Sequence, residues 1–112
     1  MRIAVLLTGL LPITAQAQVY ANEAGCARLA GKVANDGVII WAEGAFEFWE
    51  SRCPITGSQQ AGSGAALVTL ECSGEGDTWE TYYMIETTSD VDRYVVYPSD
   101  YPEIRSELTS CQ

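Results

Sequence analysis

The side chains that could carry chemistry in this 112-residue sequence are four cysteines and fifteen acidic residues, because the chain contains no histidine. Without histidine, the common Ser-His and Cys-His pairs of nucleophilic catalysis lack their base. A pair of carboxylates could still hydrolyse a glycosidic bond, and the candidates are Glu43, Glu47, Glu50, Glu71, Glu75 and Asp77. Any acidic β-rich protein offers such pairs. The sequence therefore predicts no catalytic residue and a protein that is not an enzyme.

The four cysteines are better explained as two disulfides than as a metal site. Their number is even, and disulfides persist in the oxidising compartment that an exported chain enters. A zinc site is disfavoured because the chain has no histidine and no Cys-x-x-Cys pair. We therefore predict no metal ligand and no cofactor, and assign disulfides to Cys26, Cys53, Cys72 and Cys111.

Four cysteines allow three pairings, and one geometric argument favours Cys53 with Cys72. In an antiparallel hairpin the residue numbers of opposite partners add to a constant. The pair 53 and 72 therefore places a two-residue turn at residues 62–63, within the glycine-containing segment 61–64. The two cysteines would then face each other at a Cα separation of about 4.5–5.5 Å, which a disulfide accepts. By elimination Cys26 would pair with Cys111 and tie the ends of the mature chain together.

The first seventeen residues are predicted to be a cleavable signal peptide. Arg2 precedes an apolar run over residues 3–11, and the small residues of 15–17 form a cleavage site after Ala17, so the mature chain would begin at Gln18. The apolar run is shorter than the roughly 20 residues of a spanning helix. No later segment is apolar enough to span a membrane. We expect a mature protein in the periplasm or outside the cell that does not insert into the membrane.

The elements that must position these residues are mainly β-strands. Apolar residues alternate with polar ones, or form short β-branched runs, between glycine-rich and aspartate-rich turns. This pattern predicts an antiparallel meander of five or six strands that curls into a small barrel or sandwich. The clearest strand segments are 37–41, 46–48, 68–72, 79–86 and 91–97.

Short helical segments are predicted at both ends of a single domain that spans residues 18–112. Asn22 would cap an N-terminal helix that Gly25 weakens and Gly31 ends. In that helix one face would hold Cys26, Leu29, Ala30 and Val33. Near the C-terminus, Asp100 and Glu103 resemble a capping box. Helical spacing follows at Ile104, Leu108 and Cys111.

Charge is the feature that bears on partners. The six basic residues less Arg2 leave five against fifteen acidic ones, a formal charge of −10 for the mature chain. Nucleic acid and anionic membranes would be repelled, whereas a cationic protein would be attracted. An exposed ring beside carboxylates could also stack on a sugar or hold a basic side chain. The predicted binding surface is Tyr82, Glu80, Glu75 and Asp77.

The segment 50–55 and the segment 72–79 together resemble a pattern in small exported bacterial proteins of unknown function. In physical terms this pattern is a disulfide-joined hairpin followed by a glycine turn and a buried tryptophan. Size, export, disulfides and the meander are also similar to the periplasmic inhibitors of c-type lysozyme, and residues 63–65 faintly resemble their serine-glycine loop. This resemblance implies a binding or inhibitor module for a cationic partner. The alternative is a structural envelope domain or a weak carbohydrate binder. The sequence leaves the oligomeric state open.

Overall fold

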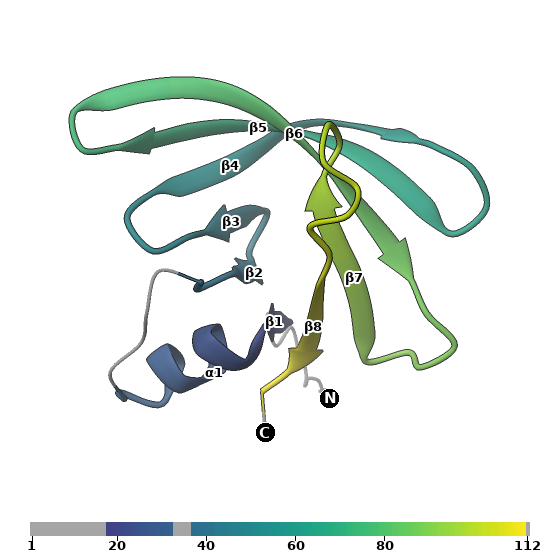
Figure 1. The fold of residues 1–112 in the computed structure, drawn as a ribbon, viewed down its shortest axis with the longest axis horizontal. Coiled ribbons are helices and arrows are strands. Elements are labelled where there is room, and N and C mark those ends of the chain that lie inside the picture. The colour runs from purple at the N-terminus through teal and green to yellow at the C-terminus, as the bar shows by residue number, and fades with distance from the viewer. Residues whose placement is uncertain (1–17, 33–36, 112) are drawn as a thin grey trace, which may run out of the picture.

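The chain folds into a closed antiparallel β-barrel of eight strands with one short helix (Figure 1). The computed structural model describes residues 18–32 and 37–111. The predicted signal peptide lies outside these residues. In the part of the chain that is described, no helix is long and apolar enough to cross a membrane. The elements are β1 (Val19–Ala21), α1 (Glu23–Leu29), β2 (Ile40–Ala42), β3 (Ala45–Glu47), β4 (Arg52–Gln60), β5 (Ala65–Gly74), β6 (Asp77–Thr87), β7 (Arg93–Pro98) and β8 (Ser106–Ser110).

The predicted mainly β architecture is confirmed, but the predicted number of strands is too low. Each strand pairs with the next along the chain, and β8 pairs back with β1 to complete the barrel. The strands that were not predicted are β1 and β8, which pair with each other where the barrel closes. β1 has only three residues, too few to show an alternating pattern.

The predicted C-terminal helix is wrong, because that segment forms a turn and then β8. Tyr101 and Ile104 donate backbone hydrogen bonds to residues three positions earlier, which closes two successive turns. The apolar residues whose spacing favoured a helix do not form one buried face, since Ile104 is 56 % exposed whereas Leu108 is fully buried. A strand here satisfies its backbone groups on both sides, against β7 and β1.

The barrel interior is filled by apolar side chains and by a run of aromatic rings. Phe46, Leu70, Val96 and Leu108 are completely buried at its centre. Phe46 stacks on Trp41 with 5.8 Å between ring centroids, and further rings continue the contacts on either side. These rings are Tyr20, Phe48, Tyr83 and Tyr94.

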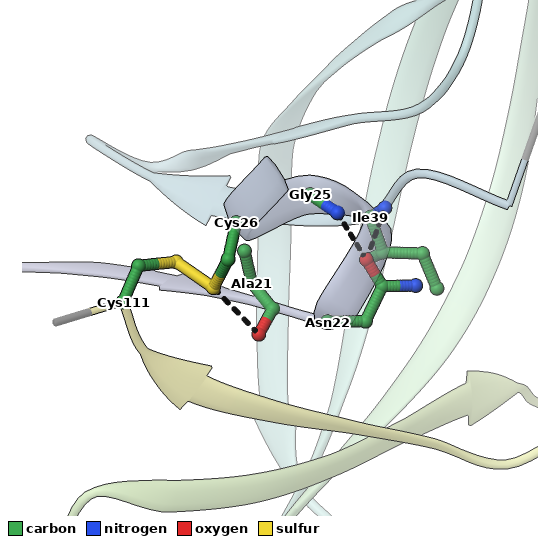
Figure 2. The surroundings of a disulfide bond; sticks show 6 residues. All are labelled: Ala21, Asn22, Gly25, Cys26, Ile39 and Cys111. Carbon is green, nitrogen blue, oxygen red and sulfur yellow. Dashed lines mark hydrogen bonds between the residues drawn. A yellow bond between two sulfur atoms is a disulfide. The ribbon is translucent and has the colours of Figure 1, made fainter. Parts of the chain in front are cut away.

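The N-terminal helix begins at Asn22, as predicted, and this residue also ties the helix to β2. The Asn22 Oδ1 atom accepts hydrogen bonds from the backbone N–H of Gly25 at 2.8 Å and of Ile39 at 3.1 Å (Figure 2). The helix ends before Gly31, whose φ is +80°. Of the predicted helix face, Val33 lies outside the described residues. Gly25 is buried and allows close packing, because a Cβ atom there would lie 2.6 Å from the Ile39 carbonyl oxygen.

Both predicted disulfides are present. Cys26 is bonded to Cys111 and Cys53 to Cys72, with Cα separations of 5.4 and 4.0 Å. The first joins the middle of α1 to the residue after β8. Two disulfides are typical of proteins from an oxidising environment outside the cytoplasm.

The hairpin turn between β4 and β5 differs from the predicted two-residue turn. The backbone N–H of Ala61 bonds to the Ala65 carbonyl oxygen at 3.0 Å, which leaves three residues in the loop. The register shifts by one residue between Ile55 and Gly57, so Thr56 is an extra residue in β4. This bulge compensates for the longer loop, and the two cysteines still face each other.

The connection between β7 and β8 is held by one polar cluster. Glu86 accepts hydrogen bonds from the Tyr97 hydroxyl and, at 2.8 Å, from the Arg105 guanidinium. That guanidinium also lies 4.8 Å from the centre of the Tyr97 ring. These hydrogen bonds hold the pKa of Glu86 below its usual range. The cluster fixes residues 99–105 against the barrel.

Replacing Gly25 with alanine should destabilise the fold by about 1–3 kcal/mol, because the added methyl group meets a backbone oxygen that cannot move freely. Denaturant unfolding measures this. Gly57→Ala is the matched control, since its Cβ would lie 3.5 Å from Thr69 Oγ1 in ordinary contact. A Gly25→Ala protein as stable as the control would contradict the proposed close approach.

Candidate functional site

The β5–β6 hairpin extends beyond β7 and carries the candidate site. β7 pairs with β6 only from Tyr83 onward, and the Ser99 N–H bonds to the Tyr82 carbonyl oxygen, so residues 77–81 pair with β5 alone. The turn is Glu75-Gly76, because Gly74 pairs with Asp77. Both turn residues have positive φ, 53° and 82°, as a type I′ turn requires. This overhanging end is therefore well defined, and β7 does not cover its β6 side.

A short loop lies against the inner face of this overhang and forms a hollow with it. Phe48 and Ser51 bond through their backbones at 2.9 Å and turn the chain between β3 and β4. The loop passes close to Gly74, where a Cβ atom would lie 2.3 Å from the Glu50 carbonyl oxygen. The resulting hollow, called here the hairpin hollow, has a volume of about 220 Å³ and is lined by Glu50, Ser51, Gly74, Glu75, Asp77 and Trp79.

Two of these carboxyl groups interact directly. A hydrogen bond to Glu75 and the charge of Glu75 raise the pKa of Glu50, because a proton between the two groups relieves their repulsion. The Trp49 indole opposes this shift by hydrogen bonding to Glu50. The hollow thus holds negative charge that a cation could neutralise.

Trp79 is exposed, which corrects the prediction of a buried tryptophan. It lies opposite Cys72, on the face of the sheet that points into the barrel. The overhang carries this residue past the strands that would cover it, and 43 % of its surface remains accessible. Its indole ring therefore forms an apolar wall of the hairpin hollow rather than part of the core.

The structure divides the predicted binding surface into two groups. Glu75 and Asp77 line the hairpin hollow. Tyr82 and Glu80 alternate with Trp79 along β6 and lie on the outer face of the sheet, where the Tyr82 hydroxyl donates a hydrogen bond of 2.9 Å to Glu80. This bond and the nearby charge raise the pKa of Tyr82.

Glu50 and Gly74 line the hairpin hollow but are not in the predicted binding surface. Glu50 was predicted only as one of six carboxylates that could form a catalytic pair. The pairing of β5 with β6 could have placed Gly74 beside the turn. The residue numbers of opposite partners in this hairpin add to a constant, which centres the turn on Glu75-Gly76. The approach of the loop at residues 48–51 depends on tertiary packing, and no local pattern encodes it.

No ion pair among the described residues neutralises the charge of the hairpin hollow, although the Arg28 guanidinium binds the neighbouring carbonyl oxygens of Phe48 and Trp49. Within the described residues, the ion pairs are Arg93 with Asp90 and Glu107, and Arg105 with Glu86. None of them includes a carboxylate of the hollow. In that same part of the chain, no group of three or more histidine, cysteine, aspartate or glutamate side chains has a geometry that could hold a metal ion.

Comparisons with known proteins identify no relative, since no family model, curated protein or solved structure matches the chain. The resemblance to small exported proteins is therefore shown only at the level of a small disulfide-bonded β-barrel.

The carboxyl pair predicts a pH-dependent effect of Glu50→Gln. The pKa of Glu50 is raised in the folded protein, so its contribution to stability is full at low pH and is lost as the pH rises through that pKa. Glutamine removes the repulsion. Glu50→Gln should therefore raise the melting temperature at pH 7 and leave it nearly unchanged at pH 3.

Thermal unfolding at the two pH values measures this effect. Glu43→Gln is the control, because Glu43 is an exposed carboxylate in the turn between β2 and β3 and does not line the hairpin hollow. Equal changes of melting temperature in the two variants at pH 7 would show that only net charge affects stability and would contradict a specific Glu50–Glu75 interaction.

Proposed function

We propose that this chain is an exported, non-catalytic binding module that takes a lysine or arginine side chain of a cationic protein into the hairpin hollow. A basic c-type lysozyme is the partner class to test first, with inhibition as the outcome. The observation that carries the proposal is the set of three carboxylates around an exposed indole, none of which is in an ion pair with a described residue.

The chemistry of the hollow suits a basic side chain. A carboxylate forms charge-assisted hydrogen bonds with guanidinium or ammonium groups, and the face of an indole attracts a cation. A volume of about 220 Å³ is below the roughly 300–1,000 Å³ of sites for drug-sized ligands. The hollow therefore matches one side chain of a protein partner better than a free small molecule.

The charge of the whole chain supports the same partner class. A formal charge of −9 accelerates encounter with a cationic protein, and salt screens this attraction over about 8–10 Å. Binding should thus weaken as ionic strength rises. The two disulfides agree with a location in the periplasm or outside the cell, where such a partner would be met.

One alternative rests on the same residues. An exposed indole beside carboxylates and the Ser51 hydroxyl could stack on a sugar ring. A carbohydrate binder of this kind would bind neutral oligosaccharides weakly, with little dependence on salt. A structural envelope domain would bind neither partner.

The test is the affinity of the purified, oxidised protein for a basic c-type lysozyme at low and at moderate salt, with cell-wall lysis followed in parallel. We expect binding that weakens with salt and loss of lysis. Glu75→Gln should weaken binding about three- to tenfold, whereas Glu43→Gln should change it less than twofold, because only Glu75 lines the hollow.

Each other result has a definite meaning. Absence of binding at both salt concentrations would remove lysozyme as the partner. Equal losses in the two variants would leave net charge as the cause and contradict a role for the hollow. Binding of a neutral chitin oligosaccharide that is lost in Trp79→Ala and insensitive to salt would favour the carbohydrate binder.

A further inference from the structure

A larger cavity lies at the other end of the barrel. In a meander, successive turns alternate between the two ends, so the β4–β5 and β5–β6 turns lie at opposite ends of the molecule (Figure 1). The cavity, called here the barrel-mouth cavity, opens beside the β4–β5 turn and has a volume of about 560 Å³. It shares no lining residue with the hairpin hollow.

The cavity exists because the inward-facing side chains become small toward this end. Along β5, Cys72, Leu70 and Val68 face the barrel interior and are buried. The next inward position is Ala66, and the opposite position on β4 is Gln60. The aromatic rings that fill the centre stop at Trp41 and Tyr94, so they form the floor of the cavity.

The bulge at Thr56 determines which β4 residues line the cavity. Before the bulge Ile55 faces Leu70, and after it Ser58 faces Val68. Without the extra residue the inward positions would pass to Gly57 and Gln59, since a shift of one residue exchanges the faces of a strand. The bulge thus brings the Ser58 hydroxyl to the cavity wall.

The lining is apolar with a neutral polar edge. Ile55, Val68 and Ile85 form the walls, and among the described residues that line the cavity there is no charged side chain. The Thr87 hydroxyl is already bonded to the Gly64 carbonyl oxygen at 3.2 Å. The Ser58 hydroxyl has no hydrogen bond to any described residue, so it can serve a ligand.

We propose that the barrel-mouth cavity binds a small, neutral, ring-shaped apolar molecule that carries one hydrogen-bonding group. A charged ligand would lose its hydration without a counter-charge. A long acyl chain would not fit, because Phe46 stacks against Trp41 and closes the interior behind the floor. The cavity volume lies within the range of small-molecule sites, which often occupy the mouths of β-barrels.

The experiment titrates the oxidised protein with N-phenyl-1-naphthylamine, a neutral aromatic amine whose fluorescence rises in apolar surroundings. Saturable binding of one molecule per chain is expected, with micromolar affinity. Ser58→Leu places a bulky side chain in the cavity and should weaken binding at least tenfold. The adjacent Gln59→Leu adds the same side chain outside the cavity and should leave binding unchanged.

A second measurement keeps the test independent of how the variants fold. In the unaltered protein, methyl NMR signals of Ile55, Val68 and Ile85 should shift with the amine, while the Trp79 indole signal should not. An anionic naphthalene sulfonate should bind at least tenfold more weakly. Shifts centred on Trp79, equal binding of the anion, or no binding up to the solubility of the amine would each overturn the proposal. Glu75→Gln alters only the hairpin hollow and should not affect binding of the amine. Each of the two proposals can therefore fail without the other.

Discussion

Closure of the sheet between β1 and β8 is the constraint on which the rest of the molecule depends. The seam consists of two residue pairs, Tyr20 with Ser110 and Ala21 with Thr109. Strands so short hold each other weakly, and the Cys26–Cys111 bond lies directly beside them. A disulfide that closes a loop of this length contributes about 4.5 kcal/mol in the loop-closure account. Covalent closure keeps water from the aromatic interior of a chain near the lower size limit for one core.

The closed barrel explains why two hollows form at its two ends. The interior is filled by large rings only in the middle, where Phe46 is fully buried. At one end the inward side chains become small, and at the other the long β5–β6 hairpin continues past β7. One end is therefore apolar and neutral, and the other is acidic with an exposed ring. The fold presents two chemically different surfaces.

Much of this arrangement could be predicted from particular residues. The helix cap at Asn22, the glycine-rich turns and the Cys53–Cys72 pairing depend on local geometry, which the sequence records directly, and the Cys26–Cys111 pairing then follows by elimination. The strands β1 and β8 could not be predicted, because β1 is too short to show a period and the β8 spacing also fits a helix. Trp79 was misplaced for another reason. Its burial depends on where the neighbouring strands end.

The central functional claim is that a cationic protein contacts the hairpin hollow, and NMR mapping tests it most directly. The oxidised protein would be titrated with a basic c-type lysozyme while the indole N–H signals of Trp41, Trp49 and Trp79 are followed. The account predicts that the Trp79 signal and the amides of residues 74–77 shift together, and that the Trp41 signal stays in place. Shifts confined to residues 58–66, or no shift at low salt, would contradict it.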